Sequence, residues 1–244
     1  MSTNYIEAIN LTKKYRDLLA LDHISFSVSG GEIFTMLGGN GAGKTTTINL
    51  FLNFIEPTDG EAKINGISVQ KEPLKAKQSV AFVSENVMLY TNFTAVQNLD
   101  YFSKLGGKTN LTENDYKRAL LRVGLQKDAH SKKLKEFSKG MRQKCGIAIA
   151  ILKDAQAILL DEPTSGLDPQ AGFEFISLIR SLRDEGKAIL MSTHDIFRAK
   201  EISDTIGIMK EGTIVMKSNR EELENKNLEE LYLHYMAGGR NQEG

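Results

Sequence analysis

The sequence predicts an α/β fold in which an antiparallel β subdomain comes first and an α-helical subdomain is inserted into a largely parallel core. Three observations support this prediction. Short apolar runs of strand length alternate with segments of helical period along most of the chain. A glycine-rich loop joins one such run, residues 33–37, to a helical pattern at 45–54. A block of helical patterns between residues 92 and 152 separates two of the predicted core strands.

Length and composition favour one globular unit. The 244 residues are enough for one substantial core, and we expect a single domain at 1–236 followed by a disordered tail at 237–244. Lys+Arg and Asp+Glu are equal at 31 each, so the charge balance does not indicate nucleic-acid binding. The N-terminus does not resemble a signal peptide, and the longest apolar run, residues 146–152, is far shorter than the roughly 18 residues that span a bilayer. We therefore expect a soluble chain that reaches a membrane only through a partner.

The one cysteine, Cys145, excludes an intramolecular disulfide and fits a reducing compartment. It lies in an apolar helical pattern at residues 139–152. A buried structural thiol is therefore favoured over a reactive one.

Residues 38–45, GGNGAGKT, fit the phosphate-binding pattern G-x-x-x-x-G-K-[ST]. Glycines let successive backbone N–H groups curve around a phosphate, and the following helix directs its N-terminus at the anion. Lys44 can reach the β- and γ-phosphates, and the Thr45 hydroxyl can bind Mg²⁺. The alternative is a glycine-rich turn with an unrelated lysine, but the strand, loop and helix order favours a nucleoside triphosphate. The loop residues predicted to contact it are Gly38, Gly39, Asn40, Gly41, Ala42, Gly43, Lys44, Thr45 and Thr46.

The flanking segments are predicted to form the antiparallel subdomain. Residues 5–11 and 24–28 have strand-like patterns, and residues 61–69 form a hairpin that turns at Asn65-Gly66. Tyr15 lies between the first two strands, where an exposed ring can stack on an adenine. Taken alone, this residue is better explained by surface packing.

The middle of the chain predicts a helical lobe at about 86–153. A strand at 79–84 precedes it, and its helices are predicted at 96–105, 113–123 and 139–152. A basic cluster lies near its last loop, and a solvated face is the default interpretation, with contact to a partner or a phosphate as the alternative. The cluster consists of Lys132, Lys133, Lys135 and Lys139.

An apolar strand at 157–162 ends in Asp161 and Glu162. Ligands of parallel sheets bind beyond the carboxyl ends of the strands, so these carboxylates are expected to face the nucleotide. Asp161 can hold Mg²⁺ through water, and Glu162 can orient or polarise the attacking water. Acidic residues also favour helix N-termini, but Pro163 interrupts such a helix. The catalytic interpretation is therefore favoured.

The C-terminal third adds a second polar strand end. A helix at 169–183 precedes a strand at 188–193, and His194 follows this strand at the same sheet edge as Glu162, where an imidazole can contact a γ-phosphate. A hairpin of strands is predicted at 205–209 and 213–217, and a helix at 219–236. The histidines expected to have ordinary surface or boundary positions are His23, His130 and His234.

Two further motifs carry a family resemblance. Residues 137–143, FSKGMRQ, resemble the signature LSGGQ followed by Arg-Gln in the ATP-binding subunits of ABC transporters. Residues 162–169, EPTSGLDP, are similar to that family's segment from the catalytic glutamate to the D-loop. With the phosphate loop, the acidic strand and the late histidine in the same order, the resemblance covers about residues 5–217. The SKGMRQ form resembles the subgroup that serves small two-component exporters of the ABC-2 kind.

The resemblance implies a RecA-like P-loop NTPase core that hydrolyses ATP to ADP and phosphate. The implied catalytic residues are Lys44, Glu162 and His194, and the implied Mg²⁺ ligands are Thr45, Asp161 and Glu85. In the family, the signature contacts ATP held by another subunit, which implies that Ser138 and Gly140 act on a partner's nucleotide, with Asp168 near the dimer seam. It also makes Tyr15 the adenine-stacking aromatic.

The chain departs from the family pattern at two places. Glu85 stands where the family usually has Gln; a carboxylate can still ligate Mg²⁺, but it adds a negative charge near the phosphates. Lys139 and Met141 replace the more common glycine and glutamine of the signature.

The resemblance also implies partners and a location. A separate integral-membrane permease is expected to dock in the groove around residues 85–105, and a second ATP-binding subunit is expected to form a homodimer, with a heterodimer as the alternative. The chain would then lie on the cytoplasmic face of the cell membrane, and the permease would select the exported substance. Two other functions are considered: a soluble ABC-type ATPase that acts as an assembly factor or scaffold, and a pseudo-ATPase that binds ATP and only signals. The intact residues that argue against the second are Lys44, Asp161, Glu162 and His194.

Overall fold

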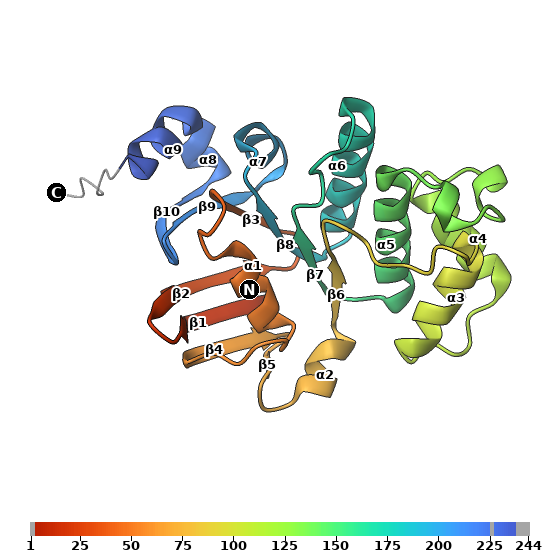
Figure 1. Cartoon of the computed structure of the whole chain (residues 1–244), viewed down its shortest axis with the longest axis horizontal. Helices are drawn as coiled ribbons and strands as arrows, with labels where there is room; N and C mark the ends of the chain where they lie inside the picture. The colour runs from red at the N-terminus through yellow and green to blue at the C-terminus, as the bar shows by residue number, and fades with distance from the viewer. Residues whose placement is uncertain (1–2, 225–226, 238–244) are drawn as a thin grey trace.

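The computed structural model describes residues 3–224 and 227–237 (Figure 1). The tail predicted at 237–244 lies outside these residues except for Ala237. Within the described part of the chain, a six-stranded sheet forms the centre and a four-stranded sheet lies beside it. The order across the central sheet is β10 (Thr213–Asn219), β9 (Thr205–Lys210), β3 (Ile33–Leu37), β8 (Ala188–Thr193), β7 (Ala157–Asp161) and β6 (Val80–Val83).

The central sheet is parallel except for β10, which pairs antiparallel with β9. Its inner strands are buried on both faces, which explains their continuous apolar sequences. In the register, Leu37 pairs with Thr193 and Asp161 pairs with Ser192. The carboxyl ends of β3, β7 and β8 therefore meet at one edge, as the sequence predicted.

The four-stranded antiparallel sheet has the order β2-β1-β4-β5 and confirms the predicted N-terminal subdomain. Its strands are β1 (Asn4–Tyr15), β2 (Leu18–Ser29), β4 (Asp59–Ile64) and β5 (Ile67–Ser68). The predicted hairpin turn is present, with left-handed φ values of 52° at Asn65 and 72° at Gly66. β1 and β2 extend beyond the predicted apolar segments because the polar residues Lys13 and Lys14 continue the pairing with β2.

The predicted helical subdomain contains α3 (Ala95–Leu105), α4 (Glu113–Arg122) and α5 (Lys139–Lys153). Each helix begins at a capping side chain, from Thr94, Thr112 and Ser138 respectively. The short helices η1 (Lys127–Ala129) and η2 (Leu134–Glu136) lie in the segment that leads to α5. Figure 1 shows these helices and the antiparallel sheet on opposite sides of the central sheet. We place the limits of this subdomain at about residues 86 and 153.

The central sheet divides the hydrophobic core in two, because side chains alternate between the faces of a strand. Ile158 and Ile189 belong to the core that includes α5 and α6 (Pro169–Asp184). Leu159 and Leu190 belong to the core formed with α1 (Lys44–Phe51) and the antiparallel sheet. The sheet is therefore held from both sides, which fixes the edge where the polar residues gather.

Three details differ from the predictions. The short helices α2 (Pro73–Gln78) and α7 (Ile196–Ile202) had no strong periodic pattern and were not predicted. The single helix predicted at 219–236 is wrong, since Asn219 ends β10 and the segment forms α8 (Arg220–Glu224) and α9 (Leu228–Met236). Asn227 causes the break: it has a non-helical backbone, and its side chain accepts hydrogen bonds from the first N–H groups of α9.

Two further sequence expectations concern burial and helix length. His130 is buried rather than at the surface, and its Nε2 lies 2.9 Å from the carbonyl oxygen of Leu125, so its role is structural. Among the described residues, no helix is both long enough and apolar enough to cross a membrane.

Cys145 provides a test of the packing of α5. Its side chain is fully buried, and burial raises the pKa of its thiol to about 12. Since the thiolate is the reactive form, we expect a thiol reagent such as dithiobis-nitrobenzoate at pH 8 to react more than about a hundredfold more slowly with the native protein than with the protein in denaturant. A Cys145→Ala variant supplies the background signal. Similar rates in the two conditions would show that α5 is not packed as described.

Candidate nucleotide-binding and catalytic site

The loop between β3 and α1 has a backbone that requires glycine. Gly41 and Gly43 have φ values of 80° and 104°, in the left-handed region. A Cβ at Gly43 would lie 2.7 Å from the Leu21 side chain, and one at Gly38 would lie 2.5 Å from the Met209 carbonyl oxygen. The loop is therefore packed between β2 and β9, with the N-terminus of α1 directly behind it. Such an arrangement presents N–H groups to an anion.

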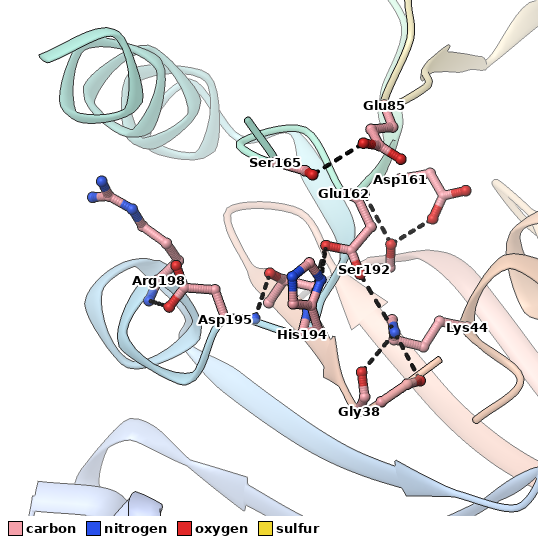
Figure 2. Close-up of polar contacts among 12 residues, drawn as sticks. Gly38, Lys44, Glu85, Asp161, Glu162, Ser165, Ser192, His194, Asp195 and Arg198 are labelled. Carbon is pink, nitrogen blue, oxygen red and sulfur yellow. Dashed lines mark hydrogen bonds and ion pairs between the residues drawn. The ribbon is translucent and has the colours of Figure 1, made fainter. Parts of the chain in front are cut away.

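Lys44 points back into this loop and is buried (Figure 2). Its Nζ donates hydrogen bonds to the carbonyl oxygens of Gly38, at 2.6 Å, and Gly39, at 3.2 Å. It also lies 3.4 Å from Oε1 of Glu162. The ammonium group is thus fixed where the loop curves, which is the position that a phosphate-binding lysine requires.

Asp161 lies at the end of β7 and faces Thr45. The Thr45 hydroxyl lies 3.2 Å from Oδ2 of Asp161, and the Ser192 hydroxyl donates a 2.5 Å hydrogen bond to Oδ1. A hydroxyl and a carboxylate are hard oxygen ligands of the kind that Mg²⁺ prefers, and Mg²⁺ usually takes one or two carboxylates with phosphates and water. The residues present therefore fit a nucleotide-bound Mg²⁺. In the described part of the chain, no group of three or more His, Cys, Asp or Glu side chains is placed to hold a metal.

Glu162 connects Lys44 with His194. Its Oε1 faces Lys44, while Oε2 lies 2.9 Å from Nδ1 of His194 (Figure 2). The Glu162 backbone is left-handed, with φ of 46°, which non-glycine residues rarely adopt. Its N–H donates to the Ser192 hydroxyl at 3.0 Å, so Ser192 holds both the strained backbone of Glu162 and the carboxylate of Asp161. Ser192 is a site residue that the sequence analysis missed, because only the register of β7 and β8 brings it there.

A cavity of about 520 Å³ lies between the phosphate loop, Asp161 and Glu162, and the described residues that line it do not include Gly38 or His194. The predicted residues among its lining are Tyr15, Gly39, Asn40, Gly41, Ala42, Gly43, Lys44, Thr45, Thr46, Glu85, Asp161 and Glu162. The lining residues that were not predicted are Leu18, Leu19, Ala20 and Glu211. They come from the start of β2 and from the turn between β9 and β10, neither of which carries a motif. A cavity of about 590 Å³ in the helical subdomain contains none of the phosphate-loop residues in its described lining.

Tyr15 lies at the rim of the nucleotide cavity. Its ring is 42% exposed, and Nζ of Lys13 lies 4.8 Å from the ring centroid. An exposed ring beside Leu18 and Leu19 is suited to cover an adenine. Its assignment as the stacking residue remains our proposal.

The signature and D-loop residues lie elsewhere. Ser138 caps α5 by accepting a hydrogen bond from Met141 N at 3.2 Å, and Asp168 caps α6 by accepting from Ala171 N at 2.9 Å. A Cβ at Gly140 would lie 3.2 Å from Ala171 Cβ, so glycine allows α5 to approach α6 closely. Of the described residues lining the cavity, none is Ser138, Gly140 or Asp168. The chain therefore does not bring these residues to its own phosphate loop.

Glu85 lies on the wall of the cavity and contacts Ser165 and Lys139. The sequence did not predict either contact. Its Oε1 accepts hydrogen bonds from Ser165 Oγ at 3.0 Å and from Lys139 Nζ at 3.2 Å. The Ser165 hydrogen bond, followed by that of Lys139, lowers the pKa of the Glu85 carboxyl. Gln143, which is fully buried, donates to the carbonyl oxygens of Ser84 and Glu85 and so attaches this loop to α5.

Together, the strand–loop–helix, the Thr45–Asp161 pair and the Glu162–His194 pair define a nucleotide-binding protein of the P-loop NTPase class. Comparison with known proteins agrees. The family model described as ABC transporter matches residues 21–165. The chain is 36% identical over 223 residues to the bacitracin transport ATP-binding protein BcrA of Enterococcus faecalis, covering 91% of this chain and 71% of BcrA. The chain therefore belongs to the ABC transporter family, as one of its ATPase cassettes.

Further comparisons support this assignment. The chain is 34% identical over 218 residues to YbhF of Escherichia coli, named a probable multidrug ABC transporter ATP-binding protein; the match covers 89% of this chain and 38% of YbhF. A structure described as the ATP binding subunit of an ABC transporter is 29% identical, with a TM-score of 0.83 and coverage of 95% and 99% of the two chains. A dimeric structure of the cassette MJ0796 bound to ADP and Pi is 25% identical, with a TM-score of 0.78 and coverage of 88% and 98%.

Ser192 can be tested by removing its hydroxyl. We expect Ser192→Ala to lower kcat/KM for Mg-ATP about 10- to 100-fold, because residues that orient a metal ligand contribute about this much. Ser203→Ala is the matched control: this buried hydroxyl bonds Thr35, away from the cavity. Steady-state ATP hydrolysis and thermal unfolding are measured for both variants. Equal activity of Ser192→Ala and wild type would contradict the orienting role.

Proposed function

We propose that this chain binds and hydrolyses ATP in order to power a separate membrane permease, as part of an exporter. The observation that carries the chemistry is the position of Glu162, between the phosphate-loop lysine and His194 and next to Asp161. The names of BcrA and YbhF, which refer to bacitracin transport and a multidrug transporter, support a transport role over that of a scaffold. The reaction is ATP + H₂O → ADP + phosphate.

The proposed mechanism assigns one task to each group. The loop N–H groups and Lys44 bind the phosphates, and Tyr15 covers the adenine. Thr45 and Asp161, with Glu85 as a further candidate ligand, would hold Mg²⁺, which neutralises phosphate charge when bound. Glu162 orients the attacking water and accepts its proton, a task suited to a carboxylate fixed by contacts on both sides. His194, fixed by Glu162, donates a hydrogen bond to the γ-phosphate.

A second subunit is proposed to complete the site. Ser138 caps α5 and is not among the described residues lining the chain's own cavity, so the N-terminus of this helix is available to a phosphate held elsewhere. Two copies arranged head to tail would place Ser138 and Gly140 of each copy against the ATP of the other, with Asp168 at the seam. The dimeric structure of the cassette MJ0796 supports a two-subunit assembly. We propose a homodimer.

The permease is proposed to dock where the helical subdomain meets the core. A groove of about 370 Å³ lies there, with a largely apolar lining that includes Phe82 and Phe102. Phe54 and Leu105 also line it and are 63% and 72% exposed. A permease helix in this groove would cover exposed apolar surface of the kind that marks interaction sites. The chain would then lie on the cytoplasmic face of the membrane.

The catalytic proposal is tested with Glu162→Gln. We expect this variant to bind Mg-ATP, to lose at least about a hundredfold in kcat, since the general base is removed, and to accumulate as an ATP-bound dimer. Glu174→Gln is the control, because Glu174 lies on the exposed face of α6 and pairs with Lys144. ATP turnover and oligomeric state are measured by phosphate release and light scattering. A variant with wild-type turnover would contradict the role of Glu162, and failure of Glu162→Gln to dimerise with ATP would contradict the composite site.

The docking proposal is tested with Leu105→Glu. A charge in the apolar groove should abolish co-purification with a co-expressed polytopic permease and should abolish ATP-dependent transport. Basal ATP hydrolysis should stay within about twofold of wild type, because the groove is separate from the nucleotide cavity. Leu233→Glu on α9 is the control, since Leu233 has a similar exposure of 65%. Intact binding and transport in Leu105→Glu would place the permease elsewhere.

A further inference from the structure

The described residues lining the nucleotide cavity are unbalanced in charge for a site that binds a polyphosphate. The lining includes four carboxylates but one ammonium group, that of Lys44. The carboxylates belong to Glu85, Asp161, Glu162 and Glu211. The charge of Glu162 is compensated by Lys44. The charge of Asp161 would be compensated by the proposed Mg²⁺. Glu85 would share that Mg²⁺ only when the metal is bound, so for a nucleotide without Mg²⁺ it needs another source of positive charge if it is not to repel the phosphates.

Lys139 supplies that charge. Its Nζ lies 3.2 Å from Oε1 of Glu85, and the side chains of Lys139 and Glu85 are 26% and 43% exposed. The same ammonium lies over the turn that follows Glu162, since a Cβ at Gly166 would be 3.5 Å from Nζ. Ser165, in that turn, donates to the same Glu85 oxygen. The carboxylate is thus held by two segments that are distant in sequence.

Lys139 lies at a position in its helix that is unfavourable for a positive charge. Lys139 is the first residue of α5, where the helix dipole disfavours a cation and favours an anion. A lysine at this position is stabilised when a carboxylate accompanies it, and Glu85 is that carboxylate. Glu85 and Lys139 both differ in charge from the residues that are usual in the family, and the two side chains are in direct contact.

We propose that Lys139, at the start of α5, is a positioning residue for nucleotide binding. It holds the Glu85 carboxylate against Ser165 and neutralises the charge of that carboxylate on the cavity wall. The lysine acts through Glu85 and not on the nucleotide of its own subunit. This inference rests on the nucleotide-binding part of the proposed function and is independent of the permease and of the transported substance.

The test is equilibrium binding of a fluorescent ATP analogue, trinitrophenyl-ATP, without Mg²⁺, to the full chain and its variants. Lys139→Met should raise Kd about three- to tenfold at low salt, the size expected for one partly screened charge near the ligand, and less at 0.5 M salt. Lys139→Arg should stay within about twofold of wild type, since it keeps the charge. Lys132→Met, which removes an exposed lysine of the same lobe, should also bind like wild type.

The decisive variant is Lys139→Met combined with Glu85→Gln. If Lys139 acts by neutralising Glu85, then Lys139→Met should change the Mg²⁺-free Kd by no more than about twofold when it is made in the Glu85→Gln background, although it weakens binding in the wild-type background. In Mg-ATP hydrolysis, Lys139→Met should raise KM more than it lowers kcat, a split that a general loss of folding would not produce. Thermal unfolding of each variant confirms that the fold is kept.

Three results would overturn the inference. Unchanged binding in Lys139→Met would show that the charge is not needed, and an equal loss in the presence and absence of Glu85 would show that Lys139 does not act through that residue. Failure of the wild-type chain to bind the analogue would contradict the proposed function as a whole, together with this inference. The first two results would leave ATP binding by the chain intact, so the two failures are distinguishable.

Discussion

The parallel register of β3, β8 and β7 is the constraint on which the site depends. It places the ends of these strands at one edge, where the phosphate loop, Asp161 and His194 follow directly. Residues separated by more than a hundred positions, such as Thr45 and Asp161, come within 3.2 Å through this register alone. A one-residue slip would exchange the two faces of a strand and move its apolar side chains out of their cores. The two cores therefore specify the geometry of the catalytic edge.

Much of this arrangement was predictable, because the signals that carry it are local. The glycine pattern before Lys44 requires left-handed backbone at Gly41 and Gly43, and the structure has it there. The buried strands were recognisable as apolar runs bounded by polar residues. Local backbone chemistry and periodicity were sufficient for the helical subdomain and for the phosphate loop, Asp161, Glu162 and His194. The site roles of the remaining residues came from the family resemblance; these residues are Tyr15, Glu85, Ser138, Gly140 and Asp168.

What the sequence did not predict consists of tertiary partners. Ser192 is one of several polar residues at a strand end, and only its pairing opposite Asp161 gives it a role. Ser165 and Lys139 acquire their role from Glu85, which is distant from both in sequence. The C-terminal helix was predicted as one segment because its charged pattern is continuous, whereas the capping side chain of Asn227 divides it. Such contacts depend on where separate elements meet and leave no periodic signal.

The effect of a charged side chain near the cavity depends on its tertiary partner as well as on its own charge. Glu85 seen alone is an added negative charge beside a polyphosphate, and Lys139 seen alone is an unfavourable cation at a helix N-terminus. Placed 3.2 Å apart, each removes the disadvantage of the other. The pair also connects the loop after β6 with the start of α5, while Gln143 binds the backbone of the same loop. Because Ser138 caps α5, a movement of the Glu85 loop on nucleotide binding would act directly on the residues proposed to face the second subunit.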